Sequence, residues 1–437
     1  MGRGLKRVAL SASIALTMAA AVLVATASAA AADPLPDLSS RAAIEQYLLS
    51  IGVDPADAVW QTGLKNYAGP SCPGVDWNCV SANAPIVQIA APLGTNQYLC
   101  TSLDCVAVQV ALGAGQNDAD CERVDKHADV VVQECFIGQA NTTGNNVAVI
   151  NQSIEQKGSV VTARQVAGIE QTNESGRNSA GFHQVIAQSS QVRGTTQSQE
   201  AHQAATLDQL TTTGDNTSNI DQLQKQTQKA SGGTDITQDQ NTTEGADLLL
   251  CDRPGDTTFD QAKNQCAEVR QNSNVLPPTG GSIRSSLSQD IREDQAASSA
   301  ETADQHQGTF PGGQSGLVDQ LSSAPVTSEA VENMRQVQTA SDVPESEVEQ
   351  SQFTGDPRCC QNQATNLASM ADITQMTNQL ASDPDAVQDA VLQGDCDSTG
   401  SCHVFQSATI DGDTESNECG PAPSCHIFTF NSQGDID

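Results

Sequence analysis

The sequence is poor in aromatic residues, in basic residues and in long hydrophobic runs, and each shortage excludes a class of protein. Aromatic residues make up 3% of the 437 residues and hydrophobic residues 37%. These values are low for an ordinary globular domain, so a large aromatic core is excluded. The 20 Lys+Arg are outnumbered by 53 Asp+Glu, which gives a formal net charge of -33. Because proteins hold nucleic acids by neutralising phosphates with Lys and Arg, no nucleic-acid partner is expected.

A single long apolar run lies at the N-terminus of the chain. Basic residues at Arg3, Lys6 and Arg7 precede small apolar residues over 8–29, which end in an Ala-Ser-Ala signal-peptidase site. This pattern predicts a secretory signal peptide over 1–29 and a secreted protein, extracellular or on the cell surface. The alternative is a permanent membrane anchor, since the run is long enough to span a bilayer. No second run of this kind follows, so no membrane span is expected after signal removal.

Cysteine usage indicates the same compartment. All fourteen cysteines lie after the signal, and exported proteins with small cores use disulfides to stabilise the fold. The adjacent Cys359 and Cys360 are not expected to bridge each other, because neighbouring residues bridge only in a strained geometry. The other cysteines form sequence-near pairs, which are the disulfide candidates Cys72/Cys79, Cys100/Cys105, Cys121/Cys135, Cys251/Cys266, Cys396/Cys402 and Cys419/Cys425.

The segment before the repeats resembles a small ordinary domain. A serine at Ser39 or Ser40 can cap a helix with Ile44 and Leu48 on its apolar side, and a second short helix is expected towards Trp60. Further on, alternating and β-branched residues over 86–89 and 106–110 predict two strands of a hairpin or meander.

Three copies of one pattern fill residues 137–226. In each copy an apolar residue and a Gln precede Gly-x-Asn, a small residue, an apolar residue and a second Gln, always at the same spacing. Chance matching on this scale is not expected. The residues that define the repeat are Gln139, Gly144, Asn146 and Gln152 in the first copy, Gln171, Gly176, Asn178 and Gln184 in the second, and Gln209, Gly214, Asn216 and Gln222 in the third.

The spacing predicts the local structure of the repeat. Landmarks at every second residue lie on one face of a strand, and Gly followed by Asn supplies positive-φ residues for a reversal. Each copy is therefore a strand-turn-strand unit that is too small to fold alone and gains stability by stacking, with inward amides forming ladders. A helix is excluded because apolar residues three and four apart are missing. The polar composition leaves a disordered region as the alternative.

The repeat resembles the curlin repeats of bacterial curli fibres, which carry the same Asn-x-Ala-x-x-x-Gln element. That element is present from Asn146 to Gln152 and from Asn178 to Gln184, and Ser218 replaces Ala in the third copy. The resemblance covers about 90 residues and implies an extracellular, amyloid-like or adhesive role in surface fibres. In curlin the Asn follows the first Gln by five residues, whereas here the separation is seven.

The C-terminal tail carries a duplicated C-x5-C-H motif, first at Cys396 to His403 and again at Cys419 to His426. Four Cys and two His could bind zinc, but an oxidising compartment favours disulfides. No nucleophile elbow, phosphate loop or paired catalytic carboxylates are present, so an enzyme is not expected and no catalytic or metal site is assigned. No cofactor is indicated, although the crowded acidic surface allows weak Ca2+ binding.

These patterns together predict a mainly β fold, a β-solenoid-like stack of strand-turn-strand Gln/Asn repeats. The favoured function is a non-enzymatic structural or adhesive protein of the cell surface or extracellular matrix that associates with itself or with a surface polymer. The alternative is a secreted binding module for carbohydrate, wall polymer or divalent cation, and a secreted hydrolase is least favoured. The expected organisation is a signal peptide (1–29), a small helical and disulfide-loop unit (39–80), short β-strands with disulfides (81–136), a Gln/Asn-rich repeat region (137–275), an acidic flexible segment (276–350) and a cystine-rich tail (351–437).

Overall fold

The computed structural model describes most of the chain after the N-terminal segment. The described residues are 40–50, 53–61, 65–81, 84–90, 92–102, 104–111, 113–126, 129–193, 196–240, 265–273, 282–307, 314–322, 326–343, 348–354, 369–381 and 387–433. They contain one helix, α1 (Arg41–Ser50). The strands are β1 (Val59–Gln61), β2 (Lys65–Ala68), β3 (Asn78–Val80), β4 (Ile86–Ala90), β5 (Thr95–Cys100), β6 (Asp104–Ala111), β7 (Gln116–Lys126), β8 (Val130–Asn141), β9 (Asn146–Lys157), β10 (Val160–Asn173), β11 (Asn178–Val192), β12 (Gln197–Thr211), β13 (Asn216–Gln240), β14 (Gln265–Ser273), β15 (Ile283–Gln307), β16 (Gln314–Ser322), β17 (Val326–Ser341), β18 (Val348–Thr354), β19 (Ser369–Leu380), β20 (Val387–Ile410) and β21 (Asp413–Gln433).

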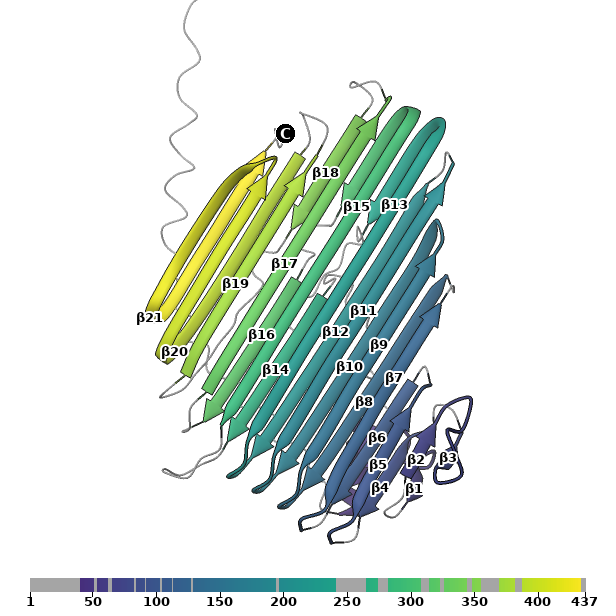
Figure 1. Cartoon of the computed structure of the whole chain (residues 1–437), viewed down its shortest axis with the longest axis vertical. Helices are drawn as coiled ribbons and strands as arrows, with labels where there is room; N and C mark the ends of the chain where they lie inside the picture. Colours follow the sequence, from purple (N-terminus) through teal and green to yellow (C-terminus); the bar gives the residue numbers. More distant parts are fainter. Residues whose placement is uncertain are drawn as a thin grey trace, which may run out of the picture. The chain divides into compact units, whose positions relative to one another are not determined.

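Strands stack in parallel with the strand two places further along the chain, so the chain winds in coils (Figure 1). Each coil contributes one strand to each of two rows, and consecutive strands such as β8 and β9 are joined by a turn from one row to the other. The first row is β5, β7, β9, β11, β13, β15, β17, β19 and β20. The second row is β4, β6, β8, β10, β12, β14 and β16. This arrangement confirms the predicted mainly β, solenoid-like fold.

Two long strands, β13 and β15, continue from the first row into the second, and β20 continues from the second row into the first. The end of β13 pairs with the start of β12, and the end of β15 pairs with the end of β13. β18 then pairs with the end of β15, and the start of β20 pairs with β18. β13 bends at Gly232 and Gly233, where φ is 69° and 127°, and β15 bends at Ser299, where φ is 55°. The glycines are required there because a side chain with a Cβ seldom adopts such φ values.

Every second side chain of a strand faces the interior, and in β6, β8, β10 and β12 of the second row the middle residues of the outer face are buried as well. In β9 the buried residues alternate with exposed or partly exposed ones along the whole strand, as the repeat spacing predicts. Ile150, Phe182 and Ile220 occupy equivalent positions in successive coils and are fully or almost fully buried in one hydrophobic cluster. Amide side chains fill the interior positions between these apolar ones. Apolar packing and amide pairing therefore alternate along each strand.

The repeat glycines are required for close approach of the backbone rather than for a positive φ, which corrects the sequence prediction. A Cβ on Gly176 would lie 1.6 Å from the carbonyl oxygen of Gly144, and a Cβ on Gly214 would lie 1.6 Å from that of Gly176. Neither glycine is among the described positive-φ residues. Asn173 closes the turn, since its Oδ1 accepts from Gly176 N at 2.7 Å and its Nδ2 donates to Gly144 O at 2.7 Å.

The N-terminal unit contains the first of the two expected helices. Ser40 caps α1, because its Oγ accepts a hydrogen bond from Ala43 N at 3.2 Å. Tyr47 on the buried side of α1 packs against Phe136 of β8, with ring centroids 5.8 Å apart. The second expected helix is instead a short turn followed by β1, whose residues pair with β4.

The hairpin or meander expected from the strands at 86–89 and 106–110 is a further correction. β4 and β6 pair in parallel, because β5 lies between them in the chain and belongs to the other row. The apolar alternation identified the strands correctly, but the pairing partner of each strand is one coil away rather than next in sequence.

The acidic range 276–350, expected to be flexible, contains β15, β16 and β17. These strands have few apolar anchors, and their parallel pairing with the preceding coil satisfies the backbone hydrogen bonds. In the tail, β20 and β21 form an antiparallel pair that places Cys396 opposite Cys425. The stack thus ends in an antiparallel strand, whereas the coils before it are parallel.

Candidate functional site: amide ladders and a polar groove

Glutamine ladders run through the interior from coil to coil. In the Gln139 row each Nε2 donates to the Oε1 of the preceding coil at 2.6–2.8 Å. The second N–H of Gln171 crosses the interior to the carbonyl oxygen of Ser179 at 3.0 Å, and so connects the two rows of strands. Both polar ends of a buried amide are thereby satisfied, as burial requires. The Gln139 row consists of Gln88, Gln109, Gln139, Gln171, Gln209, Gln271 and Gln320.

Two further glutamine rows lie in the first row of strands. In one, Gln152, Gln184, Gln222 and Gln289 are joined by hydrogen bonds of 2.7–2.8 Å. The other is the Gln188 row, which contains a fully buried carboxyl group at Glu293. Gln336 Nε2 donates to Glu293 Oε2 at 2.8 Å, as it would to a glutamine oxygen. The Gln188 row consists of Gln156, Gln188, Gln226, Glu293, Gln336 and Gln379.

An asparagine ladder lies next to the turns. The Nδ2 of each asparagine donates to the Oδ1 of the next coil at 2.8–3.0 Å, opposite to the direction of the glutamine rows. The ladder ends at Asn216, because Ile283 occupies the equivalent position in the following coil. Its members are Asn96, Asn117, Asn146, Asn178 and Asn216.

All residues that define the repeat therefore lie inside the stack or at its turns. The glutamines and asparagines are at ladder positions, and Gly144, Gly176 and Gly214 stack at the turns between the two rows. They form a structural framework with no open surface of their own.

The first three disulfide candidates form bonds near the N-terminal end of the stack. Cys100 bonds to Cys105 and Cys121 to Cys135, and the two disulfides occupy equivalent positions in successive coils. Sulfur atoms of Cys100, Cys105 and Cys121 lie within 4.8 Å of one another, as in a metal site. They are oxidised, however, so they offer no thiolate to a metal. The remaining bond is Cys72–Cys79.

The other cysteines are less completely described. Cys419 is disulfide-bonded, while the positions of Cys251, Cys359 and Cys360 lie outside the described residues, as do the side chains of Cys266, Cys396, Cys402 and Cys425.

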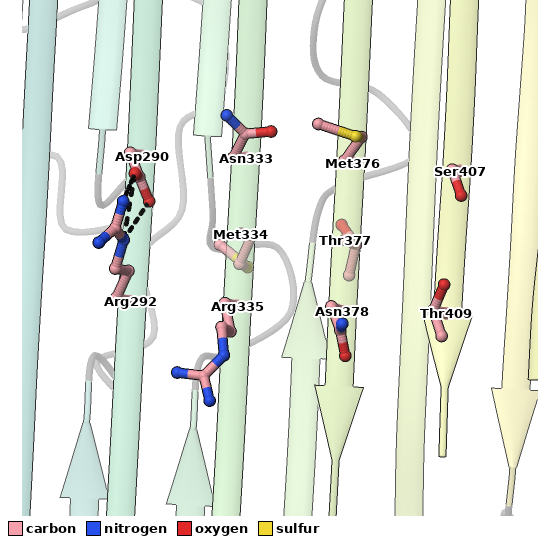
Figure 2. Close-up of a pocket in the computed structure, with 10 residues that line it drawn as sticks. All are labelled: Asp290, Arg292, Asn333, Met334, Arg335, Met376, Thr377, Asn378, Ser407 and Thr409. Carbon is pink, nitrogen blue, oxygen red and sulfur yellow. Dashed lines mark hydrogen bonds and ion pairs between the residues drawn. The ribbon is translucent and has the colours of Figure 1, made fainter. Parts of the chain in front are cut away.

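A polar groove of about 560 Å³ crosses the outer face of the first row of strands (Figure 2). Two lines of residues border it, each contributed by four successive strands in register. The first line is Asp290, Asn333, Met376 and Ser407, and the second is Arg292, Arg335, Asn378 and Thr409. Met334 and Thr377 lie between the lines and are buried. The groove therefore runs across the strands, with equivalent positions one strand spacing apart, roughly 4.8 Å.

Ion pairs hold both arginines of the groove. Arg292 Nε donates to Asp290 at 3.1 Å, and Arg335 Nη1 donates to Asp294 at 3.0 Å. The hydrogen bonds that Arg292 donates to Asp290 are the main reason why the pKa of Arg292 is raised above its usual value. Both arginines are half exposed, so part of each guanidinium group faces solvent.

Lys225 of β13 extends the line of cations by one strand. It is exposed and directly precedes Arg292 in the parallel register, as Arg292 precedes Arg335. Like charges on neighbouring strands destabilise a sheet. Three consecutive cations are therefore an unusual feature in a chain with a net charge of -33. We call Lys225, Arg292 and Arg335 the cation line.

The cation line was not predicted from the sequence. The three residues are far apart in the chain, and only the strand register brings them together. The sequence does carry a usable signal for two of the three, because Lys225 and Arg292 each lie three residues after a ladder glutamine, Gln222 or Gln289.

Protein-family models, curated proteins and solved structures were compared with the chain, and none of them matches it. Within the described part of the chain, no helix has the length and apolar character needed to cross a membrane.

Proposed function

We propose that this protein is an exported structural or adhesive protein of the cell surface or extracellular matrix, without enzymatic activity. The observation that carries the proposal is the set of amide ladders that run in register through successive coils. Ladders of this kind connect every coil to its neighbours and make a repetitive scaffold rigid without a large apolar core.

Two other features support the proposal. The N-terminal disulfides are typical of an oxidising, extracellular compartment. The resemblance to curlin repeats favours a surface role. Most of the polar side chains of the repeat form hydrogen bonds with each other inside the stack, which is typical of a scaffold rather than of a catalyst.

The test is to locate the protein in the cells that produce it. Antibodies raised against the purified chain are used on cytosolic, envelope and extracellular fractions, with and without protease treatment of intact cells. We expect the chain in the envelope or extracellular fraction, with loss of the surface signal after protease. A chain found only in the cytosol would overturn the proposal.

The structural role is measured separately. Deleting the gene should lower the adhesion of the producing cells or the cohesion of their matrix, and the oxidised wild-type chain added from outside should restore it. Electron microscopy and thioflavin-T fluorescence of the same preparation then distinguish a fibre from a single adhesive molecule.

A further inference from the structure

We propose that the groove on the first row of strands binds a polysaccharide that carries carboxylate groups, of the polyuronate class. The inference deepens the adhesive function proposed above and rests on its extracellular placement, because it names the surface polymer that the molecule would hold.

The charges of the groove select an anionic ligand. Arg292 and Arg335 lie side by side in register at one edge of the groove, and Lys225 continues the line. The planar guanidinium group binds a carboxylate with two parallel hydrogen bonds. Asp290 accepts from one side of the Arg292 guanidinium group, and Asp294 accepts from one side of the Arg335 group. Both groups are thereby held in a fixed orientation, and the N–H donors on their other side are available to a ligand.

The shape of the groove selects a repeating polymer. Each of its two lines repeats once per strand over four strands, and one sugar ring of an extended glycan is close to one strand spacing in length. Asn333 belongs to the first line, and Asn378 and Thr409 follow the two arginines in the second line. These side chains supply amide and hydroxyl groups of the kind that hydrogen-bond to sugar hydroxyls.

The composition of the groove disfavours a neutral glycan. None of the ten residues that line it is aromatic, whereas large apolar faces are what a sugar ring without charge would stack on. Met376, which is 44% exposed, is the one large apolar side chain of the groove that is open to solvent. Recognition must therefore come from charge and hydrogen bonds.

An acidic peptide is disfavoured by the backbone. A peptide gains affinity from a sheet by pairing with a free strand edge. The groove instead crosses strands that are already paired on their neighbours: β15 with β13 and β17, and β19 with β17 and β20. The net charge of -33 also gives no general attraction for polyanions, so any affinity must come from the cation line itself.

The experiment measures binding of oligogalacturonate to the full oxidised chain by calorimetry, with neutral xylan oligosaccharides and polyglutamate of equal charge as comparison probes. We expect saturable binding of oligogalacturonate that weakens as salt is added, and much weaker binding of the other two. The double variant Arg292→Gln, Arg335→Gln should lose affinity by about tenfold or more.

Two controls separate the groove from its surroundings. Arg284→Gln removes the same charge from an exposed position on the same face of β15, outside the groove, and should leave the affinity unchanged. Asp290→Asn releases Arg292 from its ion pair and should raise the affinity. Circular dichroism of every variant reports whether the strands are intact.

Several outcomes would overturn the inference. They are absence of binding by an intact wild-type chain, equal loss with Arg284→Gln, or binding of polyglutamate as tight as that of oligogalacturonate. Because binding uses the purified chain and the location test uses the producing cells, the two proposals fail separately. If the protein lies at the surface but does not bind oligogalacturonate, only the binding proposal fails. If the protein binds oligogalacturonate but lies in the cytosol, only the proposed surface function fails.

Discussion

The coils of β8 to β13 and those of β15 to β20 have the same backbone pairing but different interiors. The earlier coils combine amide ladders with large apolar side chains such as Ile150 and Phe182. They also have stacked turn glycines and an asparagine ladder. The later coils lack the Gly-x-Asn turn, and the asparagine ladder ends where Ile283 replaces its next member.

The glutamine rows pass through both regions. Gln289 donates to Gln222 at 2.8 Å, and Gln307 donates to Gln240 at 2.9 Å, each across the boundary between the two sets of coils. The apolar row also continues, with the smaller Leu287 and Ala330 in place of Phe182. The comparison indicates that amide ladders and an apolar row are common to both regions, whereas the Gly-x-Asn turn and the asparagine ladder belong to the earlier coils.

The largest expected effect comes from the stacked glycines, which belong to the earlier coils alone. Gly176→Ala places a methyl group against the Gly144 carbonyl, where a Cβ would be 1.6 Å away, so the coils must separate. We expect a loss of at least about 3 kcal/mol in the free energy of unfolding, measured by urea denaturation. Gly181→Ala is the matched control, because its Cβ would meet nothing closer than 4.0 Å. A similar loss in both variants would contradict the close-approach explanation.

The next effect tests whether a ladder amide has the same value in both regions. Gln184→Ala removes bonds to Gln152 and to the Ala204 carbonyl, and Gln338→Ala removes bonds to Gln295 and to the Gln305 carbonyl. Each should lower local stability by about 2 kcal/mol, because a buried partner is left unsatisfied. Native-state hydrogen exchange of the neighbouring strands measures both losses. A cost near zero for Gln338→Ala would mean that the later coils do not depend on their ladder.

A smaller effect, a gain in the free energy of unfolding, is expected when the carboxyl group in the Gln188 row is replaced by an amide. Glu293 is fully buried, and the other members of the row are glutamines. Burial of a carboxyl group costs more free energy than burial of an amide, which can both donate and accept along the row. Glu293→Gln should therefore raise the stability at neutral pH by about 1 kcal/mol. The measurement is the urea midpoint, with Glu329→Gln on the exposed face of β17 as the control. A destabilised Glu293→Gln would show that the carboxyl is preferred at this position.

The smallest effect concerns pH and the outer face of β7. Burial, and then Asp118 and Glu122, raise the pKa of Asp120. The unfolded chain consequently releases this proton first as pH rises, so the contribution of Asp120 to stability falls between its ordinary pKa and the raised one. Asp120→Asn should flatten this fall, which begins at the ordinary Asp pKa of about 4, and leave stability at lower pH unchanged. Urea midpoints across that range decide the question, and Glu174→Gln in an exposed turn serves as the control.

The sequence predicts the ladder residues well because their positions are set by local spacing. Gln139, Gly144 and Asn146 keep the same separations in all three copies, and the period of two assigns them to one face of a strand. The reason for the glycines was not predictable, since close contact between Gly144 and Gly176 depends on the stacking distance between coils. The parallel pairing of β4 and β6 was missed because alternation gives the face of a strand but not its partner.

The groove could not be predicted from local spacing. Arg292 and Arg335 become neighbours only because β15, β17 and β19 pair in parallel in a constant register. Composition over 276–350 did not indicate β15, β16 and β17, because their backbone groups are satisfied by parallel pairing with the preceding coil and few apolar residues are needed.

The antiparallel β21 gives its edge of the stack a different character from that of the parallel coils. A parallel coil leaves an open edge on which a further coil could be added, which is how amyloid fibres elongate. β21 reverses direction, and its first half carries the exposed carboxyl groups of Asp413, Glu415 and Glu418, followed by Pro421. A further parallel coil would meet at this edge a strand that runs in the opposite direction and carries exposed carboxyl groups, so we expect this edge to disfavour end-to-end stacking of two molecules.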